Sequence, residues 1–276
     1  MPSMLKGYFD HTDKVAVVTG GAGVLCKAIA RAYANEGVKV AILDINEERA
    51  IAAAEEINTE GGKAEGVMCN VLDAGSVETA LELVMKTFGK VDILVNGAGG
   101  NKKEATTSDT MDFFSIPADA IRWVFDLNCL GTIIPSQVFG QQMSRQGDGT
   151  ILNVSSMNAF TPLTKIAAYS AAKAAVSNFT QWLAVHMAQN YTPKIRVNAI
   201  APGFFLTEQN RFLLTDEKTG ELTPRGQTIS DHTPAGRFGD PDDLLSTVIW
   251  LTGPGARFVT GIVVPVDGGF SAFSGV

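Results

Sequence analysis

The chain has 276 residues, of which 45% are hydrophobic, and its formal net charge is −7. This length allows one α/β domain with a substantial core, which we expect to span residues 1–276 with the folded core at about 14–269. The acidic balance, without a basic cluster, argues against nucleic acid and against an anionic membrane surface as partners.

The N-terminal residues lack the apolar centre of a signal peptide, and no apolar run approaches the roughly 20 residues that cross a bilayer. Three widely spaced cysteines, Cys26, Cys69 and Cys129, are typical of reduced core residues. We therefore expect a cytoplasmic protein that does not span a membrane. The histidines show no metal-ligand spacing, so we also expect no catalytic metal.

The first predicted elements are a strand, a glycine turn and a helix. Residues 14–19 form a short apolar, β-branched run, a glycine-rich turn follows at once, and residues 24–36 have a helical pattern that Gly37 ends. Glycines let the backbone approach a pyrophosphate, and the start of a helix favours its negative charge. We therefore predict a dinucleotide site at this turn, formed by Gly20, Gly21, Gly23, Val24 and Leu25.

The second predicted strand, 38–43, ends at Asp44, which follows the glycine turn by about 20 residues. A carboxylate at this point can accept hydrogen bonds from an adenosine ribose and repel a 2′-phosphate. The sequence therefore favours NAD over NADP as the cofactor. The alternative role for Asp44, compatible with the first, is an ordinary strand-end acid that caps the next helix.

The rest of the chain alternates helix and strand without a linker. Helices are predicted at 46–57, 73–88, about 115–145, 168–189 and from 241 onward. The third strand is predicted to end with residues 67–71, and the later strands are predicted at 91–95, 149–154, 194–200 and 259–264. Pro135 should kink the helix at 115–145. Crossover handedness and the glycine turn imply a doubly wound, single-domain Rossmann fold with a parallel sheet of strand order 3-2-1-4-5-6-7. Two long loops, 97–117 and 203–236, follow strand ends, where ligands bind.

Tyr169 and Lys173 lie four residues apart in a predicted helix, and Ser156 precedes Tyr169 by thirteen residues. Residues four apart share one face of a helix and can touch the same ligand. A tyrosine hydroxyl has a reference pKa of about 10, and a fixed ammonium nearby would lower it. Tyr169 could then move a proton at a carbon that also exchanges a hydride, while Ser156 holds the substrate oxygen. The alternative is that Tyr169 and Lys173 are merely a pair on a helix surface.

Together these features resemble the short-chain dehydrogenase/reductase family along nearly the whole chain, from about Lys14 to Gly269. Thr19-Gly20 fits the opening of the family's cofactor motif, Thr-Gly-x-x-x-Gly-x-Gly. The other matching segments are Asn96-Gly-Ala-Gly99, Pro202-Gly203 with Thr207, Asp267-Gly-Gly269, and the set Ser156, Tyr169 and Lys173. The resemblance implies reversible hydride transfer between a nicotinamide cofactor and a carbinol, with the tyrosine as acid and base.

The resemblance also assigns roles to single residues. Asn128 falls at the family's active-site asparagine, where it would order a water that relays protons from Lys173; the alternative is a residue that satisfies backbone groups at a helix kink. Asn70 falls at the position that contacts adenine, where the family usually has Asp. The other positions implied to hold the cofactor are Val71, Asn96, Ala98, Gly99, Tyr169, Lys173, Pro202, Gly203, Phe205 and Thr207.

The chain departs from the family motifs at three positions. Gly97 replaces the second Asn of Asn-Asn-Ala-Gly, and Val24 and Cys26 replace the second and third glycines of the cofactor motif. Val24 carries a branched Cβ near the expected pyrophosphate, whereas Cys26 is small enough for close helix–strand packing. The alternative for Cys26 is a reactive thiol at a helix start.

A homotetramer is also implied, because family members commonly pack their two long helices and last strand against other subunits. Phe179, Trp182 and Leu183 could supply an apolar seam for this contact, or they could face the core of their own domain.

A narrower likeness is to the D-mannonate oxidoreductase (fructuronate reductase) branch of the family, and it rests on residues 96–101, 155–165, 178–184 and 201–211. It implies D-mannonate and D-fructuronate as substrates. A hydroxylated sugar acid needs polar partners and a cation for its carboxylate, and among the candidate cations bidentate geometry favours Arg211. The candidates are Asn101, Lys102, Lys103, Asn158, Lys165 and Arg211, although such charges can also merely solvate loops.

Three other functions fit the sequence. One is another sugar, polyol or keto-acid dehydrogenase, such as a gluconate 5-dehydrogenase. The second is a 3-ketoacyl reductase, whose acidic acyl carrier would require a basic surface patch; the acidic sequence gives no sign of such a patch. The third is a protein that senses NAD without turnover, for which the set of Ser156, Tyr169 and Lys173 would have no use.

Overall fold

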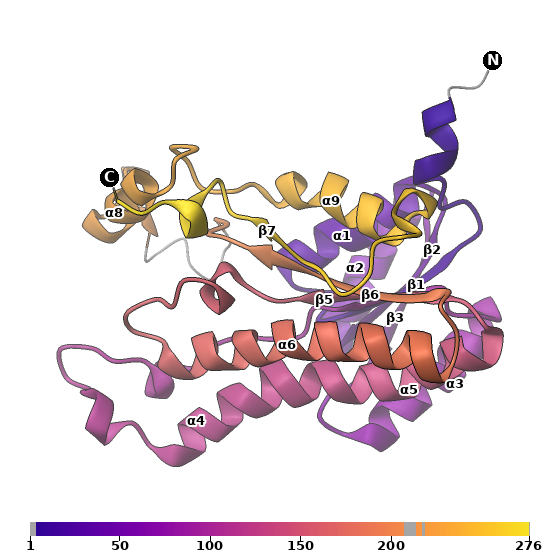
Figure 1. Ribbon diagram of the computed structural model, residues 1–276, viewed down its shortest axis with the longest axis horizontal. Coiled ribbons are helices and arrows are strands. Elements are labelled where there is room, and N and C mark those ends of the chain that lie inside the picture. Colours follow the sequence, from indigo (N-terminus) through magenta and orange to yellow (C-terminus); the bar gives the residue numbers. More distant parts are fainter. Residues whose placement is uncertain (1–3, 207–213, 217–218, 276) are drawn as a thin grey trace.

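The computed structural model describes residues 4–206, 214–216 and 219–275. It contains one sheet of seven parallel strands in the order β3-β2-β1-β4-β5-β6-β7, as the sequence predicts (Figure 1). The strands are β1 (Val15–Thr19), β2 (Lys39–Asp44), β3 (Lys63–Met68), β4 (Ile93–Asn96), β5 (Gly149–Val154), β6 (Ile195–Pro202) and β7 (Val263–Val266).

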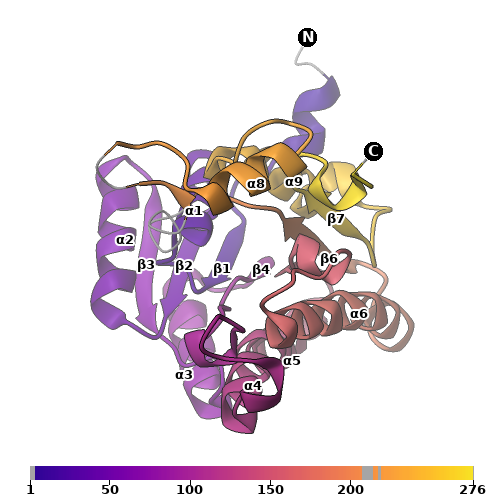
Figure 2. The ribbon, with the colours of Figure 1, turned by 90° about the vertical axis from the view of Figure 1, so that its left-hand side faces the viewer.

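Helices cover both faces of this sheet, because successive side chains of a strand point to opposite faces and both sets are apolar here. In β1, Ala16 and Val18 pack with α1 (Val24–Asn35), α2 (Glu47–Thr59) and α9 (Leu245–Thr252). Val15 and Val17 of the same strand pack with α3 (Ala74–Phe88), α5 (Gly131–Gln146) and α6 (Ala167–Asn190) on the other face. Figure 2 shows these layers end-on. No described helix has the length and apolarity that would let it cross a membrane.

The starts of α2 and α3 follow from their capping residues. The Asn46 side chain accepts a hydrogen bond from the backbone N–H of Arg49, and the Asp73 side chain accepts one from Gly75. Each satisfies a donor that the first helical turn leaves unpaired. Gly89 ends α3 at φ +80°, a left-handed conformation that glycine adopts without a Cβ penalty.

The long helix predicted at 115–145 is divided. α4 (Ala118–Phe125) passes into a π-helical turn, Asp126–Leu130, before α5 begins. The interruption therefore lies upstream of Pro135, which is buried inside α5. In this π-helical turn a side-chain bond adds to the backbone bonds, because the Asn128 amide donates to the backbone carbonyl of Val124.

Three further boundaries differ from the prediction. The third strand ends at Met68, so residues 69–71 continue beyond the sheet, and the last strand begins at Val263 rather than at 259. The loop predicted at 203–236 contains a helix, α8 (Pro224–His232), with Thr223 as its cap. Short 3₁₀ turns occupy Met4–Phe9, Lys103–Ala105, Phe113–Ser115, Met157–Ala159, Pro241–Leu244, Pro254–Ala256 and Phe270–Ala272.

Candidate active site

Ser156, Tyr169 and Lys173 come together where β5 and the start of α6 meet. Ser156 follows the carboxyl end of β5, and its hydroxyl is hydrogen-bonded to the Tyr169 phenol. The Lys173 Nζ donates to the Val154 carbonyl at 2.8 Å and lies 5.6 Å from the centroid of the Tyr169 ring. Ser156 and Lys173 are buried and Tyr169 is partly exposed, so the trio is not a pair on an outer helix surface.

Burial sets the proton affinities of this trio. It lowers the pKa of Lys173 to about 8, because a buried ammonium loses its hydration. Burial also raises the pKa of Tyr169, and the hydrogen bond with Ser156 opposes that rise. The net direction for Tyr169 is therefore upward, opposite to the lowering that the sequence led us to expect from Lys173. Loss of water around the phenol outweighs the Ser156 bond, and the Lys173 ammonium faces the ring and bonds to a backbone carbonyl.

Asn128 holds the backbone beside Lys173. Its Nδ2 donates to the carbonyls of Gly100 at 2.7 Å and Val124 at 2.8 Å, and its Oδ1 accepts from the Gly100 N–H at 3.2 Å. These are the bonds expected of the alternative role, in which the residue satisfies backbone groups at a helix irregularity. A Cβ on Gly99 would lie 2.7 Å from Asn128 Oδ1 and 3.2 Å from Lys173 Nζ, so this glycine allows the segment to approach both side chains.

The glycine turn fits a dinucleotide cofactor. Gly20 has φ +61°, and a Cβ there would lie 2.9 Å from the Cα of Ala98. A Cβ on Gly21 would lie 2.8 Å from the Val18 carbonyl. Unlike α2 and α3, α1 begins at Gly23 without any side-chain cap, so its first N–H groups are open to an anionic ligand.

The Asp44 carboxylate spans the end of β2 and the glycine turn. Its Oδ2 accepts from the Ala22 N–H at 3.2 Å and its Oδ1 from the Asn46 N–H at 3.1 Å. The cap of α2 is Asn46, so the capping role considered for Asp44 belongs to its neighbour. Arg49 reaches the same turn, where its Nη2 donates to the Ala22 carbonyl at 3.3 Å.

Several predicted cofactor residues have structural contacts. Asn96 is buried, and its Nδ2 donates to Ser136 and Asn153, so this side chain belongs to a core network. Phe205 is buried against Gly239, where an added Cβ would lie 2.6 Å from its ring. The remaining ones lie along the carboxyl edge of the sheet: Asn70, Val71, Ala98, Pro202 and Gly203. Thr207 lies outside the described residues.

Cys26 and Gly97, both departures from the family motifs, fit each other. A Cβ on Gly97 would lie 2.1 Å from the Cys26 Sγ and 2.9 Å from the Thr19 carbonyl. Cys26 is buried, and burial raises the pKa of its thiol to about 12, which favours the small packing residue over the reactive thiol. The Cys26 sulfur therefore fills the space that a side chain on Gly97 would need. The Thr19 hydroxyl accepts from the N–H groups of Gly97 and Ala98 and fixes this segment against β1.

The candidate substrate residues are divided. The Asn158 side chain is buried and accepts from the Leu163 N–H, whereas Asn101 donates to Thr106 on the outside. Lys165 is exposed, and its carbonyl accepts from the Thr107 N–H, which ties the loop at 97–117 to the segment before Tyr169. Lys102 lies over the ring of Trp123, 5.5 Å from its centroid. Arg211 lies outside the described residues.

Sequence reasoning missed two features of this region. One is the contact between Cys26 and Gly97, although both departures from the motifs were visible. The other is Arg225 in the first turn of α8, whose sequence signal is the Thr223-Pro224 pair that starts the helix. Within the described ranges there is no group of three or more His, Cys, Asp or Glu residues that could hold a metal ion.

A doubly wound parallel sheet, a glycine turn at an uncapped helix start and a Ser, Tyr and Lys set beside the carboxyl end of a strand define a nucleotide-dependent dehydrogenase. The model of the short chain dehydrogenase family matches residues 14–218. The chain belongs to this family, and it is an oxidoreductase that acts on alcohol groups.

Comparison with known proteins gives relatives over the whole length. The chain is 48% identical to the uncharacterized oxidoreductase UxuB of Bacillus subtilis (strain 168), covering 99% of this chain and 100% of that protein. It is similar to the crystal structure of a Haemophilus influenzae protein provisionally described as a D-mannonate oxidoreductase, with NAD bound: TM-score 0.90, 45% identity, 97% and 98% of the two chains. A gluconate 5-dehydrogenase from Burkholderia cenocepacia J2315 with NADP and tartrate has TM-score 0.86 and 29% identity over 97% and 98%.

Proposed function

We propose that the protein interconverts D-mannonate and D-fructuronate with NAD(H). The observation that carries the chemistry is the buried contact of Ser156, Tyr169 and Lys173 at the carboxyl edge of the sheet. The substrate is supported by the likeness, over nearly the whole chain, to the Haemophilus influenzae protein. A gluconate 5-dehydrogenase activity is the second candidate, supported by the likeness to the Burkholderia cenocepacia enzyme.

Bound NAD supplies the hydride acceptor and NADH the hydride donor. In the oxidation direction Tyr169 takes the proton of the substrate hydroxyl, and in reduction it returns a proton to the carbonyl oxygen. Ser156 donates a hydrogen bond to the same oxygen and stabilises the charge that develops on it. Lys173 places its ammonium 5.6 Å from the centroid of the Tyr169 ring, and the hydrogen bond with Ser156 opposes the rise in phenol pKa that burial causes. Asn128 and Gly99 keep the backbone beside Lys173 in place, and a water on the second lone pair of Asn128 Oδ1 would relay protons to solvent.

Assays of the purified protein with NADH test the substrate. We expect loss of NADH absorbance with D-fructuronate at a kcat/KM well above that for 5-keto-D-gluconate, and no useful rate with a 3-ketoacyl thioester. A higher kcat/KM for 5-keto-D-gluconate would select the second candidate. Tight NADH binding without turnover of any of these three compounds would favour a protein that senses the cofactor.

The cofactor preference is expected to depend on Asp44. We propose that this carboxylate, hydrogen-bonded to the glycine turn, repels a 2′-phosphate, so that wild-type kcat/KM is higher with NADH than with NADPH. Asp44→Ala removes that charge and leaves the Arg49 guanidinium at the same turn. We expect the ratio of kcat/KM for NADPH over NADH to rise about tenfold or more, the equivalent of about 1.4 kcal/mol. An unchanged ratio in this variant would assign the preference elsewhere.

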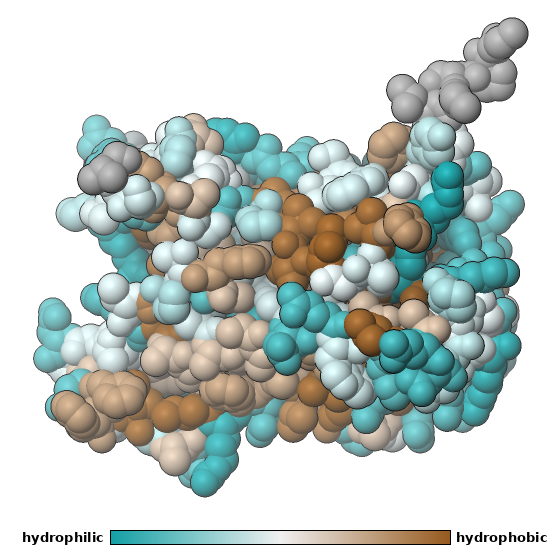
Figure 3. Space-filling model, viewed as in Figure 1, coloured by the Kyte–Doolittle hydropathy of each residue, from teal (hydrophilic) through white to brown (hydrophobic). Residues whose placement is uncertain are grey.

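We propose a homotetramer, because α6 and β7 expose apolar side chains that other subunits could cover. Trp182 on α6 is 56% exposed, whereas Leu183 is buried in the core of its own domain and Phe179 packs partly against that core. β7 is an edge strand, and Figure 3 shows apolar side chains around it, whereas along α6 apolar and hydrophilic side chains are mixed. Light scattering of the purified protein should give about four times its mass of 29.2 kDa. A mass equal to one chain at assay concentrations would contradict the assembly.

A cytoplasmic location is proposed from the cysteines. Cys26, Cys69 and Cys129 are all free thiols, and the first two are buried. Free, buried thiols are typical of proteins in a reducing compartment.

A further inference from the structure

α8 is fixed beside the catalytic serine by two contacts. Gly226 packs so tightly that an added Cβ would lie 2.1 Å from the Leu214 carbonyl. Ile229, one turn further on, belongs to the same buried apolar cluster as Met157, the residue next to Ser156. The first turn of α8 therefore has a defined position relative to the reacting end of the site.

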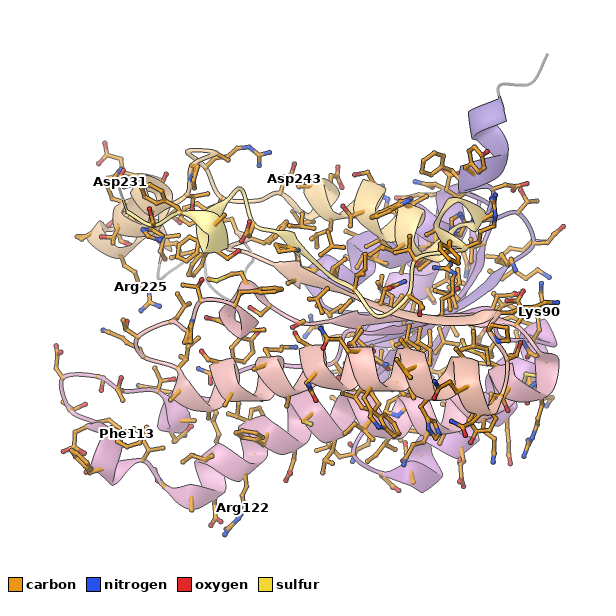
Figure 4. All side chains as sticks on the ribbon, viewed as in Figure 1. Lys90, Phe113, Arg122, Arg225, Asp231 and Asp243 are labelled. Carbon is orange, nitrogen blue, oxygen red and sulfur yellow. The ribbon has the colours of Figure 1, made fainter. Side chains whose placement is uncertain are left out.

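The Arg225 side chain extends from this first turn toward a hollow in the surface. In Figure 4 it extends from α8 into the space between α8 and the lower layer, which carries Phe113 and α4. Figure 3 shows that the surface is hollowed between these two parts. The same view places the Arg122 side chain on the outer side of α4, directed away from this hollow.

Arg225 also differs from the other described arginines in its bonding. It makes no hydrogen bond or ion pair with any residue that the structure describes. Each of the others has a partner: Arg31 with Glu60, Arg49 with Ala22, Arg122 with Asp119, Arg145 with Gln141, Arg196 with Leu251, Arg237 with Asp243 and Arg257 over the Tyr8 ring. An exposed guanidinium held on a helix start is thus left with its planar pair of donors open.

The proposed substrate needs a cation at some distance from Tyr169. In D-fructuronate the reacting ketone is at C2 and the carboxylate is at C6, so four carbon–carbon bonds, roughly 5 Å when extended, separate them. A group that binds the carboxylate therefore lies several ångströms from the Tyr169 hydroxyl, and a guanidinium on an element across the hollow matches a carboxylate in bidentate geometry.

We propose that Arg225 binds the carboxylate of the sugar-acid substrate and so selects acids over neutral ketoses. This assignment rests on the proposed function, because it requires a substrate with a carboxylate remote from the reacting carbon. Lys103 and Lys165, which are exposed and are also candidates in the sequence, are the competing cations among the described residues. Arg225 acts by binding the substrate and touches no reacting atom.

The test compares Arg225→Gln and Arg225→Lys with the matched control Arg122→Gln. For D-fructuronate we expect Arg225→Gln to raise KM and lower kcat/KM by about ten- to a hundredfold, since the lost bond is a charged one. The value of kcat at saturation should stay within about twofold, and Arg225→Lys should recover part of the loss. D-Fructose carries a hydroxymethyl group in place of the carboxylate, so its kcat/KM should not fall. Arg122→Gln should behave as wild type.

The outcomes separate the two proposals. If the wild type reduces D-fructuronate and Arg225→Gln does so equally well, while Lys165→Gln raises KM, the assignment to Arg225 is wrong and the proposed function stands. An equal loss of activity toward D-fructuronate and D-fructose, or a fall in kcat alone, would also overturn it. If the wild type prefers 5-keto-D-gluconate, the same comparison applies to that acid. A wild type that reduces neutral ketoses and no sugar acid contradicts both proposals.

Discussion

Tyr169→Phe should lower kcat by about a hundred- to ten-thousandfold while the protein still binds NADH. The change removes only the hydroxyl that is hydrogen-bonded to Ser156 and leaves the ring against Ala168 and its apolar neighbours. Stopped-flow or steady-state rates with D-fructuronate give kcat, and NADH fluorescence titration gives the binding constant. Tyr191→Phe, at the exposed end of α6, is the matched control and should leave kcat unchanged.

The pH dependence of the same reaction follows from the proton affinities of the trio. Burial raises the pKa of Tyr169, and a base must be deprotonated, so oxidation should speed up as pH rises toward that pKa. Reduction needs the protonated phenol and should slow over the same range. The Lys173 ammonium, with its pKa lowered to about 8, is progressively lost above that pH. Full activity of Tyr169→Phe at any pH would end the assignment of the proton to this residue.

Gly97→Ala should both destabilise the protein and impair catalysis. Its new Cβ would lie 2.1 Å from the Cys26 Sγ and 2.9 Å from the Thr19 carbonyl, so the surrounding backbone has to move. Overpacking of this kind costs about 1–3 kcal/mol of unfolding free energy. The displaced segment also carries Gly99, which lies against Asn128 and Lys173, so kcat/KM should fall as well. Urea unfolding and steady-state kinetics measure the two effects.

The control and the rescue for this prediction come from the same contacts. A Cβ on Gly100 meets nothing closer than 3.8 Å, so Gly100→Ala should be tolerated. In the double variant Cys26→Ala, Gly97→Ala, the nearest Cys26 atom is its Cβ, 3.6 Å from the new one, which is an ordinary contact. The double variant should recover part of the lost stability, and the contact with Thr19 should keep the rescue incomplete. Equal stabilities for Gly97→Ala and Gly100→Ala would show that the sulfur does not fill this space.

The strand order and the chemistry of the trio could be predicted because they depend on local patterns. Apolar, β-branched runs separated by helical periods imply a parallel sheet, and crossover handedness together with the glycine turn implies its strand order. The spacing of Tyr169 and Lys173 on one helix needs no knowledge of distant residues. Asn46 and Gly89 likewise bound their helices through bonds and dihedral angles of their immediate neighbours.

Several of the features that sequence reasoning missed depend on residues far apart in the chain. The π-helical turn at Asp126–Leu130 accompanies a bond network of Asn128 with Gly100, and the last strand is set by its pairing with β6. The prediction that the Tyr169 pKa is lowered was wrong, because the loss of water around a side chain depends on tertiary packing and not on the sequence spacing of Tyr169 and Lys173.

The family, the strand order and the three residues at the reacting end could be inferred from the sequence alone, because they depend on short motifs and on their order along the chain. Three other features are visible only in the folded chain: Cys26 fills the space left by Gly97, Asp44 reaches the glycine turn, and Arg225 extends toward the hollow from α8. These contacts form between segments that are distant in the sequence, and folding brings their atoms within a few ångströms of one another. The order of residues along the chain does not give those distances.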